Sequence, residues 1–471
     1  MFKPTIFREY DIRGAADVEL LDADVAQLGR AFGTYLRRHA GKRISLGRDT
    51  RLSSPRLREA LMRGLKASGC EVIDLGVVPT PVLYYSVFHL KTDGAVMITG
   101  SHNPPEFNGF KTVCGESTIH GAAIQEIRRM IDTGDLDAGD GSETTADVVT
   151  PYVAEVSAQF HFRRRIRVVF DAGNGTGGVV MHRILENLNV DATEMFFEMD
   201  GRFPNHHPDP TVPANLEALI EKVRESKADL GIAFDGDTDR IGAVDDDGTI
   251  IWGDQLMIIY GREILTRKPG ATFIGEVKCS QLMYDDLKAR GGHPIMWKTG
   301  HSLIKAKMKE THAELAGEMS GHIFFADRWY GFDDALYSAC RLMEIVADSG
   351  RPLSHQLADL PVTVATPEIR FDCPDELKFA VVAEAVAVLR ARHKTEDIDG
   401  VRVLFPHGWG LVRASNTQPI LVMRFEATTQ ELLEEYRREI EAVVEAAKLR
   451  AQGGTDDRLT SSVKPPDSGT A

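Results

Sequence analysis

The sequence repeats one arrangement of hydrophobic segments three times, and this repetition limits the fold more than any other feature. Each copy has an apolar strand, a helix, a second strand and a helix, then a third strand that ends in an unusual polar loop. The copies lie at residues 43–103, 165–240 and 271–322. Continuous apolar strands that alternate with amphipathic helices are typical of α/β layers with parallel or mixed sheets. The pattern therefore predicts three similar α/β domains.

After about residue 362 the pattern changes to strand, helix, three strands and a last helix, which indicates a smaller α+β domain with a mainly antiparallel sheet. The last helix is expected to start with a capping box at Thr428 and Glu431. A chain of 471 residues is too long for one core. We expect an α/β protein whose domains surround a central cleft, with these boundaries: α/β domains at 1–146, 147–249 and 250–361, an α+β domain at 362–450, and a disordered tail at 451–471.

The charge and the cysteine pattern exclude several classes of partner and location. The net charge of −15 opposes binding to nucleic acids and to anionic membranes. The N-terminus does not resemble a signal peptide, and no apolar run is long enough to span a bilayer. Five scattered cysteines without a CxxC pair predict reduced thiols, not a disulfide framework or a zinc site. We expect a cytoplasmic protein, either a monomer or a homodimer.

In each repeat the third strand leads into a polar loop, namely TGSHNP, DGDTDR or GEMSGH. Ligands of open α/β sheets bind beyond the carboxyl ends of the strands. We therefore expect the three loops to meet around one cleft.

The loop FDGDTDR predicts a metal site. Asp235, Asp237 and Asp239 alternate, so that their carboxylates could converge on one cation, and oxygen ligands favour Mg²⁺ over Zn²⁺. A calcium-binding helix–loop–helix is excluded because Arg240 occupies the sixth position, where that loop needs glycine. A solvated acidic turn is the alternative, and the adjacent Arg240 favours the metal.

The loop TGSHNPPEFNGFK presents Ser101 on a stiff segment, because Pro104 and Pro105 prevent a helix. It does not match the G-x-S-x-G elbow of hydrolases. A phosphorylated serine would carry nearly two negative charges and would need a cation beside it. The aspartate loop could hold that cation, with Arg240, Lys111 and Arg13 adding positive charge. An ordinary turn hydrogen bond is the alternative role for this serine.

Two further loops suit a sugar phosphate. In GEMSGH, side chains two apart share one face of an extended chain, so Glu318, Ser320 and His322 could bind neighbouring sugar hydroxyls. A helix cap at Ser320 would explain the motif equally well. The loop VRASNTQP offers groups for a phosphate oxyanion, and a hairpin turn is its alternative. Its candidate residues are Arg413, Ser415, Asn416 and Thr417.

Together these motifs resemble the α-D-phosphohexomutase family, and most closely its bacterial phosphomannomutase/phosphoglucomutase enzymes. The matching segments are FREYDIRG, TGSHNPPEFNGFK, DGDTDR, KTGHSLIK, GEMSGHIFF and RASNTQP, in family order from residue 7 to residue 419.

The resemblance implies a role for each candidate residue. Ser101 is similar to the phosphoserine, and together with Asp235, Asp237 and Asp239 to the Mg²⁺ ligands. The GEMSGH residues are similar to the sugar-binding loop and the RASNTQP residues to the distal phosphate site. Other matching active-site positions are Tyr10, Arg13, Lys111, Arg240, Lys278 and His301. We expect His102 and Lys111 to transfer protons. Thr238 stands where many relatives have a smaller residue.

The implied activity interconverts the 1-phosphates and 6-phosphates of mannose and glucose. Phosphorylated Ser101 would give its phosphoryl group to the sugar phosphate, and the resulting glucose or mannose 1,6-bisphosphate would turn and return its other phosphate. Met319 is similar to the mannose/glucose branch, whereas glucosamine-phosphate enzymes typically carry glutamine there. Phosphoglucosamine mutase is therefore the second candidate activity. A Mg²⁺-dependent sugar phosphatase and a non-catalytic sugar-phosphate sensor are weaker alternatives.

Three other features are expected to be structural. The segment NHHPDP at 205–210 is interpreted as a loop and DAGNGTGG at 171–178 as a strand-to-helix turn. Trp329 is expected to pack in the core, although it lies near the sugar loop in the sequence.

Overall fold

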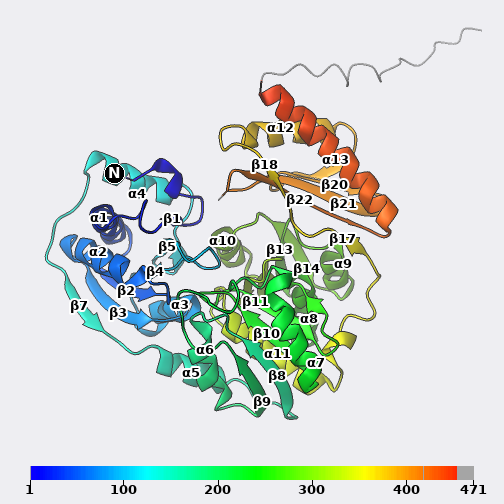
Figure 1. Cartoon of the computed structure of the whole chain (residues 1–471), viewed down its shortest axis with the longest axis horizontal. Coiled ribbons are helices and arrows are strands. Elements are labelled where there is room, and N and C mark those ends of the chain that lie inside the picture. The colour runs from blue at the N-terminus through cyan, green and yellow to red at the C-terminus, as the bar shows by residue number, and fades with distance from the viewer. Residues whose placement is uncertain (1, 417, 453–471) are drawn as a thin grey trace, which may run out of the picture. The chain divides into compact units, whose positions relative to one another are not determined.

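The structure is a computed structural model that describes residues 2–416 and 418–452 (Figure 1). The chain forms two compact units, Met1–Leu360 and Pro361–Ala471, and each is described by itself. Thr417 and nearly all of the tail that was expected to be disordered lie outside the described residues. Among the described residues, no helix has both the length and the hydrophobicity needed to cross a membrane.

The first α/β layer of the first unit is a mixed sheet with the order β1-β5-β4-β2-β3-β7, and β6 pairs with β5. Its strands are β1 (Ile12–Ala15), β2 (Arg43–Arg48), β3 (Glu71–Val77), β4 (Gly94–Ile98), β5 (Phe107–Cys114), β6 (Ser117–Thr118) and β7 (Ser142–Thr145). Its helices are α1 (Asp22–His39), α2 (Ser54–Ala67), α3 (Thr80–His89) and α4 (Ala122–Thr133). Strands β2, β3 and β4 run parallel, and β5 returns antiparallel to β4.

The second layer has the strand order β12-β11-β10-β8-β9, and the third has the order β14-β13-β15-β16. The second contains α5 (Val149–Ser157), β8 (Ile166–Asp171), α6 (Gly177–Leu185), β9 (Val190–Met195), α7 (Glu217–Ser226), β10 (Leu230–Phe234), β11 (Ile241–Asp245) and β12 (Ile250–Ile251). The third contains α8 (Gly253–Arg267), β13 (Thr272–Glu276), α9 (Gln281–Ala289), β14 (His293–Trp297), α10 (His301–Thr311), β15 (Leu315–Gly317), β16 (Ile323–Phe325) and α11 (Ala335–Ser349). Short 3₁₀ helices lie at Pro4–Ile6, Pro213–Leu216 and Leu353–His355.

The three copies share one local plan, which confirms the repeat. In each copy the third strand is followed by an antiparallel strand that pairs with it: β4 with β5, β10 with β11, and β15 with β16. The polar loops TGSHNP, DGDTDR and GEMSGH are the connections within these three pairs. The loops therefore project from the carboxyl ends of buried strands, as predicted.

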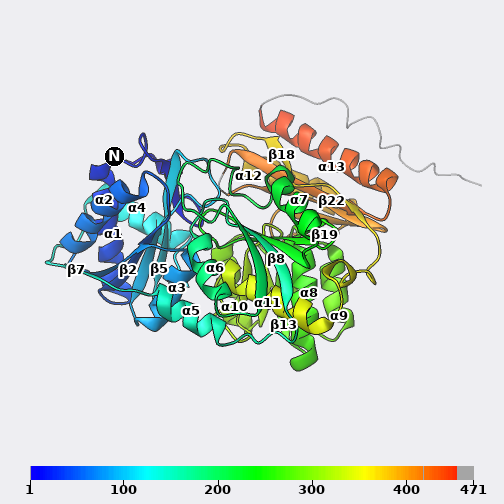
Figure 2. The same ribbon diagram turned by 60° about the horizontal axis from the view of Figure 1, so that its bottom comes forward.

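Both faces of the central strands β2 and β4 of the first sheet are buried, which explains why β4 is continuously apolar. In β4, Val96 and Ile98 belong to a core that includes residues of α1, α2 and α4, whereas Ala95 and Met97 belong to a second core. Figure 2 shows helices α1, α2 and α4 beside this sheet. That second core continues through α3, the second layer and the third layer. Because the three layers share it, they form one compact unit.

Trp329 belongs to this shared core, as expected. It is 8% exposed, and its ring stacks on Tyr337 with a centroid distance of 4.6 Å. Its indole N–H donates to Asp334 at 3.0 Å. Tyr85 and Tyr152, from the other two layers, complete the aromatic cluster.

The second unit is an antiparallel sheet with the order β17-β22-β21-β20-β19, and β18 also pairs with β22. Its elements are β17 (Val364–Ala365), β18 (Ile369–Asp372), α12 (Lys378–Arg390), β19 (Lys394–Glu396), β20 (Val401–Phe405), β21 (Gly408–Ala414), β22 (Ile420–Ala427) and α13 (Gln430–Ala451). The predicted α+β class is confirmed, and the short strands β17 and β19 are additional. The helix cap is Thr429, whose side chain accepts from Leu432 N, so the predicted Thr428 is wrong by one residue. Thr428 still donates its N–H to the His407 carbonyl.

Candidate active site

The serine loop presents its hydroxyl inside the protein. Ser101 is 2% exposed and has a φ of +50°, in the left-handed region that few residues other than glycine adopt. Its N–H donates to Thr99 Oγ1 at 2.8 Å, and its hydroxyl donates to Asp235 Oδ2 at 2.8 Å. His102 Nδ1 lies 3.1 Å from the same hydroxyl. The structure thus joins the serine loop directly to the aspartate loop of the second layer.

Arg51 holds the serine loop through hydrogen bonds to its backbone. This residue was not among the candidates predicted from the sequence. Its side chain is fully buried, and its Nε donates to Asp49 Oδ2 at 3.1 Å. The remaining guanidinium nitrogens donate to four carbonyls of the loop, those of Ser101 (2.7 Å), Asn103 (2.6 Å), Pro104 (2.6 Å) and Phe107 (2.9 Å). A Cβ at Gly100 would lie 2.4 Å from the guanidinium carbon, so only glycine fits there. The available signal was the position of GRDTR, at the carboxyl end of the first strand.

The aspartate loop gathers three buried carboxylates. Oxygens of Asp235, Asp237 and Asp239 all lie within 4.8 Å of one another. Thr80, at the start of α3, donates its hydroxyl to Asp237 Oδ2 at 2.6 Å. Lys111 Nζ donates to the same oxygen at 2.7 Å and also contacts Asp239. Burial alone would lower the pKa of Lys111, but the surrounding carboxylates raise it well above its ordinary value.

These residues fit a Mg²⁺ ion. Burial, and then the charges of Asp237 and Asp239, raise the pKa of Asp235 well above its ordinary value. Among the residues that the structure describes, none donates a hydrogen bond to Asp237 Oδ1, although this oxygen is buried. Buried carboxylate oxygens without donors are the ligands that a hard divalent cation takes. A cation here would also reduce the repulsion among the three carboxylates.

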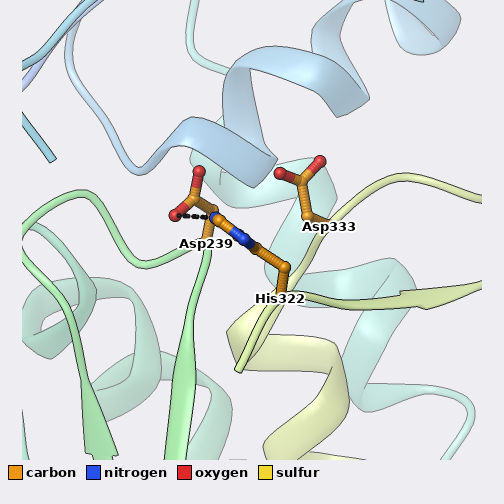
Figure 3. Close-up of side chains that lie close together, drawn as sticks. All are labelled: Asp239, His322 and Asp333. Carbon is orange, nitrogen blue, oxygen red and sulfur yellow. Dashed lines mark ion pairs between the residues drawn. The ribbon is translucent and has the colours of Figure 1, made fainter. Parts of the chain in front are cut away.

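A second group of acidic and histidine side chains lies beside the first. Asp239, His322 and Asp333 offer atoms within 4.8 Å of one another, and Figure 3 shows them converging from separate segments. His322 Nε2 contacts Asp239 Oδ1 at 3.3 Å, and Nδ1 contacts Glu318 Oε2 at 2.6 Å. Burial would lower the pKa of His322, but Asp239 and Glu318 raise it to about 9. Because His322 contacts a carboxylate through each ring nitrogen, this group forms an ion-pair cluster.

The raised pKa of His322 predicts a pH dependence of stability in the metal-free protein. The folded-state pKa of about 9 exceeds the ordinary value of 6.5, so the stabilisation is complete below 6.5 and is lost as the pH rises through 9. Urea unfolding in EDTA should show the free energy of unfolding falling by up to about 3 kcal/mol over this range. His322→Gln should remove this slope, whereas His161→Gln, at an exposed position, should keep it. Equal slopes in wild type and His322→Gln would contradict the assignment.

The sugar loop is a turn between β15 and β16, so the alternative of a helix cap at Ser320 is wrong. Glu318 Oε1 accepts the N–H of Gly300 at 2.7 Å, and Ser320 Oγ lies 3.4 Å from His322 Nδ1. Burial would raise the pKa of Glu318, but His322 lowers it to about 2. Lys278 Nζ lies 3.7 Å from Glu276, close to this loop. The loop therefore presents an ionised carboxylate beside a cationic imidazole.

The N-terminal candidates lie at the edge of the same site. Tyr10 donates its hydroxyl to the Thr299 carbonyl at 2.6 Å, and its ring centroid is 6.2 Å from that of His301. Arg13 donates to Asn103 Oδ1 in the serine loop at 3.0 Å. Arg240 forms an antiparallel bridge with His322. Within the first unit, the structure thus brings together the candidates from all three layers.

Asp333 is a second residue that the sequence analysis missed. It is fully buried, and its Oδ1 accepts from Lys305 Nζ at 2.8 Å. His301 Nδ1 lies 3.8 Å from its other oxygen. In the sequence, the pair Asp333–Asp334 before α11 looks like a helix cap, and Asp334 is indeed that cap. No local sequence pattern indicates that Asp333 contacts Lys305 and His301 while Asp334 caps the helix.

The two residues expected to transfer protons differ in charge. Burial, followed by the charges of Arg240 and Arg13, lowers the pKa of His102 well below its ordinary value, so its imidazole is neutral at pH 7. Lys111 carries a proton and pairs with two carboxylates. A neutral imidazole can accept a proton, and an ammonium group cannot. Their roles in proton transfer stay predictions.

The phosphate-loop candidates lie in the second unit, where the loop joins β21 to β22. Arg413 Nε donates to Asp399 at 2.8 Å, and Ser415 Oγ accepts the N–H of Gln418 at 3.1 Å. Lys378 donates to the Gln418 carbonyl at 3.2 Å. Asn416 lies between these contacts in the sequence, and Thr417 lies outside the described residues. The segment is a hairpin loop, and its phosphate-binding role stays a prediction.

Comparisons with known proteins match the whole arrangement. Models of the phosphoglucomutase/phosphomannomutase family match this chain in four parts: α/β/α domain I at 4–138, domain II at 150–248, domain III at 252–364 and the C-terminal domain at 368–443.

Relatives and solved structures agree with this match. A phosphomannomutase/phosphoglucomutase of Pseudomonas aeruginosa is 46% identical over 447 residues, which cover 93% of this chain and 96% of that protein. A phosphoglucomutase of Neisseria gonorrhoeae is 45% identical, covering 94% and 97%. The crystal structure of a phosphoglucomutase/phosphomannomutase family protein from Burkholderia thailandensis has a TM-score of 0.89 at 42% identity, covering 95% and 98%. The chain therefore belongs to the phosphoglucomutase/phosphomannomutase family of mutase enzymes.

Proposed function

We propose that this enzyme interconverts hexose 1-phosphates and hexose 6-phosphates, with mannose and glucose as its sugars. Phosphorylated Ser101 and a 1,6-bisphosphate carry the phosphoryl group between the two positions. One observation carries the proposal: the buried Ser101 hydroxyl lies 2.8 Å from Asp235, within a cluster of three aspartates suited to Mg²⁺. A Mg²⁺ ion bound by these aspartates would neutralise the charge of a phosphoserine at this position.

In the first half-reaction, the bond between Ser101 Oγ and phosphorus breaks, and a bond forms between phosphorus and the free hydroxyl of the sugar phosphate. The proton of that hydroxyl passes to a base, for which neutral His102 is our candidate, and the same base gives a proton to the released Ser101 oxygen, which lies 3.1 Å from His102 Nδ1. In the second half-reaction, the bond between the sugar oxygen and the other phosphorus of the reoriented bisphosphate breaks, and a bond forms between Ser101 Oγ and that phosphorus. The serine proton passes through the same base to the sugar oxygen. Mg²⁺ held by Asp235, Asp237 and Asp239 would offset charge on the transferring group.

The sugar is held through polar groups that suit both substrates. Mannose and glucose differ only at C2, so an enzyme that binds the 3- and 4-hydroxyls through Glu318 and Ser320 accepts either sugar. Because the two ends of the substrate exchange places during the cycle, a second site must hold the phosphate that is not reacting. The loop of Arg413, Ser415 and Asn416 is our candidate for that binding site. The presence of Met319 favours these sugars over glucosamine phosphate.

The bisphosphate serves as intermediate and as activator of an unphosphorylated enzyme. A more distant structure, of Aspergillus fumigatus N-acetylphosphoglucosamine mutase, contains glucose 1,6-bisphosphate. At 12% identity that likeness shows only a shared fold, and it makes glucose 1,6-bisphosphate a suitable compound to test as an activator of this enzyme.

The acidic net charge and the scattered cysteines support a cytoplasmic location.

Initial rates with mannose, glucose and glucosamine 1-phosphates, each with a trace of the matching 1,6-bisphosphate, test the proposal. We expect formation of mannose and glucose 6-phosphates at comparable rates, and little product from the glucosamine compound. Faster turnover of glucosamine 1-phosphate would contradict the sugar assignment. Steady release of inorganic phosphate without isomer formation would indicate a phosphatase, and binding without turnover would indicate a sensor.

Removal of the metal should stop the reaction. We expect EDTA to lower the rate by at least about 10²-fold and added Mg²⁺ to restore it, because the charge on the transferring group would lose its counterion. Asp237→Asn should weaken the response to Mg²⁺. Asp247→Asn, at an exposed acidic turn of the same layer, should behave as wild type. Full activity after exhaustive chelation would contradict the assigned role of the aspartate loop.

A further inference from the structure

Thr238 lies between two of the proposed metal ligands and has an unusual backbone conformation. Its φ is +66°, in the left-handed region, which is rare for a β-branched residue. This conformation turns the chain between Asp237 and Asp239, whose carboxylates then approach the same point. Thr238 is fully buried, so the surrounding contacts must maintain this conformation.

Thr176, on the turn before α6, makes those contacts. Its Oγ1 lies 3.2 Å from Thr238 Oγ1. Its backbone N–H donates to the Gly236 carbonyl at 3.1 Å, and its hydroxyl lies 3.4 Å from the same oxygen. One assignment of the protons uses both hydroxyl contacts: Thr238 donates to Thr176, and Thr176 donates to Gly236. Thr176 thus contacts the aspartate loop on both sides of Asp237.

The glycines beside Thr176 allow this close approach. A Cβ at Gly175 would lie 2.6 Å from the Gly236 carbonyl oxygen, and a Cβ at Gly177 would lie 2.7 Å from two atoms of the Thr238 side chain. Both contacts are too short for any residue other than glycine. The stretch DAGNGTGG is therefore a turn that supports the aspartate loop, which accounts for two of its four glycines, Gly175 and Gly177, without a phosphate ligand.

We propose that Thr176 and Thr238 are positioning residues for the metal: their hydroxyl pair holds the loop of Asp235, Asp237 and Asp239 in the shape that binds a divalent cation. The inference rests on the proposed function only in requiring that this loop binds Mg²⁺. Loss of either hydroxyl should weaken metal binding and leave the chemistry intact once the metal is saturating.

The test measures Mn²⁺ binding to the full-length, dephosphorylated protein by electron paramagnetic resonance, without turnover. Thr176→Val and Thr238→Val should each weaken binding by about 2- to 10-fold, the range expected for one buried hydrogen bond. The double variant should be no weaker than the weaker single variant, because both changes remove the same contact. Thr238→Ser, which keeps the hydroxyl, should bind nearly as well as wild type.

Thr34→Val is the matched control. Thr34 is also fully buried, and its hydroxyl donates to the Arg30 carbonyl at 2.8 Å and accepts from Asp137 N at 3.0 Å. This substitution makes the same chemical change inside the first layer, so it should alter stability and leave Mn²⁺ affinity unchanged. In the mutase assay, Thr176→Val should need more Mg²⁺ for half-maximal rate and should reach the wild-type maximum.

Wild-type Mn²⁺ affinity in both single variants, or losses that add in the double variant, would overturn the inference. If Thr238→Val does not fold, Thr176→Val decides alone, because it leaves the aspartate loop sequence intact. A failure of the proposed function looks different. If the protein converts no hexose phosphate but the threonine variants lose Mn²⁺ affinity non-additively, the proposed function fails and the inference about Thr176 and Thr238 stands. If the protein is an active mutase but the variants show no such non-additive loss, the inference fails and the proposed function stands.

Discussion

Ser101→Ala should lower the mutase rate by at least about 10³-fold, since removal of a covalent carrier eliminates the reaction path and leaves only binding. The substituted side chain keeps the backbone contacts of the loop, including the N–H bond to Thr99 and the carbonyl bond from Arg51. We therefore expect a folded protein that binds glucose 1-phosphate with an affinity close to that of wild type. A coupled assay measures the rate, and isothermal titration calorimetry measures the binding.

Ser117→Ala is the control for this experiment, because Ser117 is an exposed serine that follows β5 in the same layer. It should retain full activity. Activity of Ser101→Ala near the wild-type level would require another phosphoryl carrier. A joint loss of activity and binding would indicate that the serine supports the site mainly by its structure.

Arg51→Ala should destabilise the protein by about 3–5 kcal/mol, because it leaves the buried Asp49 carboxylate without its cation. It would also remove the donor from four carbonyls of the serine loop. Mutase activity should fall with it, since the position of Ser101 depends on these bonds. Arg51→Lys keeps the charge but has too few donors for all five partners, so an intermediate loss is expected. Urea unfolding gives the free energy.

Arg128→Ala is the matched control, because Arg128 lies on α4 and makes a partly exposed ion pair with Asp132 at 3.6 Å. A pair of this kind contributes about 0.5 kcal/mol or less. A loss below about 1 kcal/mol for Arg51→Ala would contradict the role assigned to the buried guanidinium.

The parts of the fold that could be predicted are those with a local periodic signal. The strands around Ile98, Phe234 and Gly317 are short apolar runs, and each is followed at once by its polar loop, so strand, loop and layer could be assigned together. The common core of the three layers had no such signal. This core forms where α3 and one face of β4 pack against the second and third layers. Because both faces of β4 are apolar, the sequence does not show which face packs against the other layers.

The candidate site divides in the same way. Ser101 and the aspartates stand in loops whose composition indicates their chemistry. Arg51, by contrast, acts on backbone carbonyls about fifty residues away, and a contact with backbone leaves no trace in the sequence of its partner. Asp333 was hidden by its neighbour Asp334, which has the ordinary role of a helix cap. The cap at Thr429 shows how two adjacent threonines make a one-residue error unavoidable from sequence alone.

The central claim is that Ser101 carries the phosphoryl group during turnover. The most direct measurement incubates the enzyme with glucose 1,6-bisphosphate labelled with ³²P in both phosphates, stops the reaction by rapid quench and maps the label to a peptide. We predict label on Ser101, and its loss to unlabelled hexose phosphate at a rate at least equal to the turnover number. Full-rate isomerisation with no label on Ser101, or label that leaves more slowly than product forms, would contradict the account.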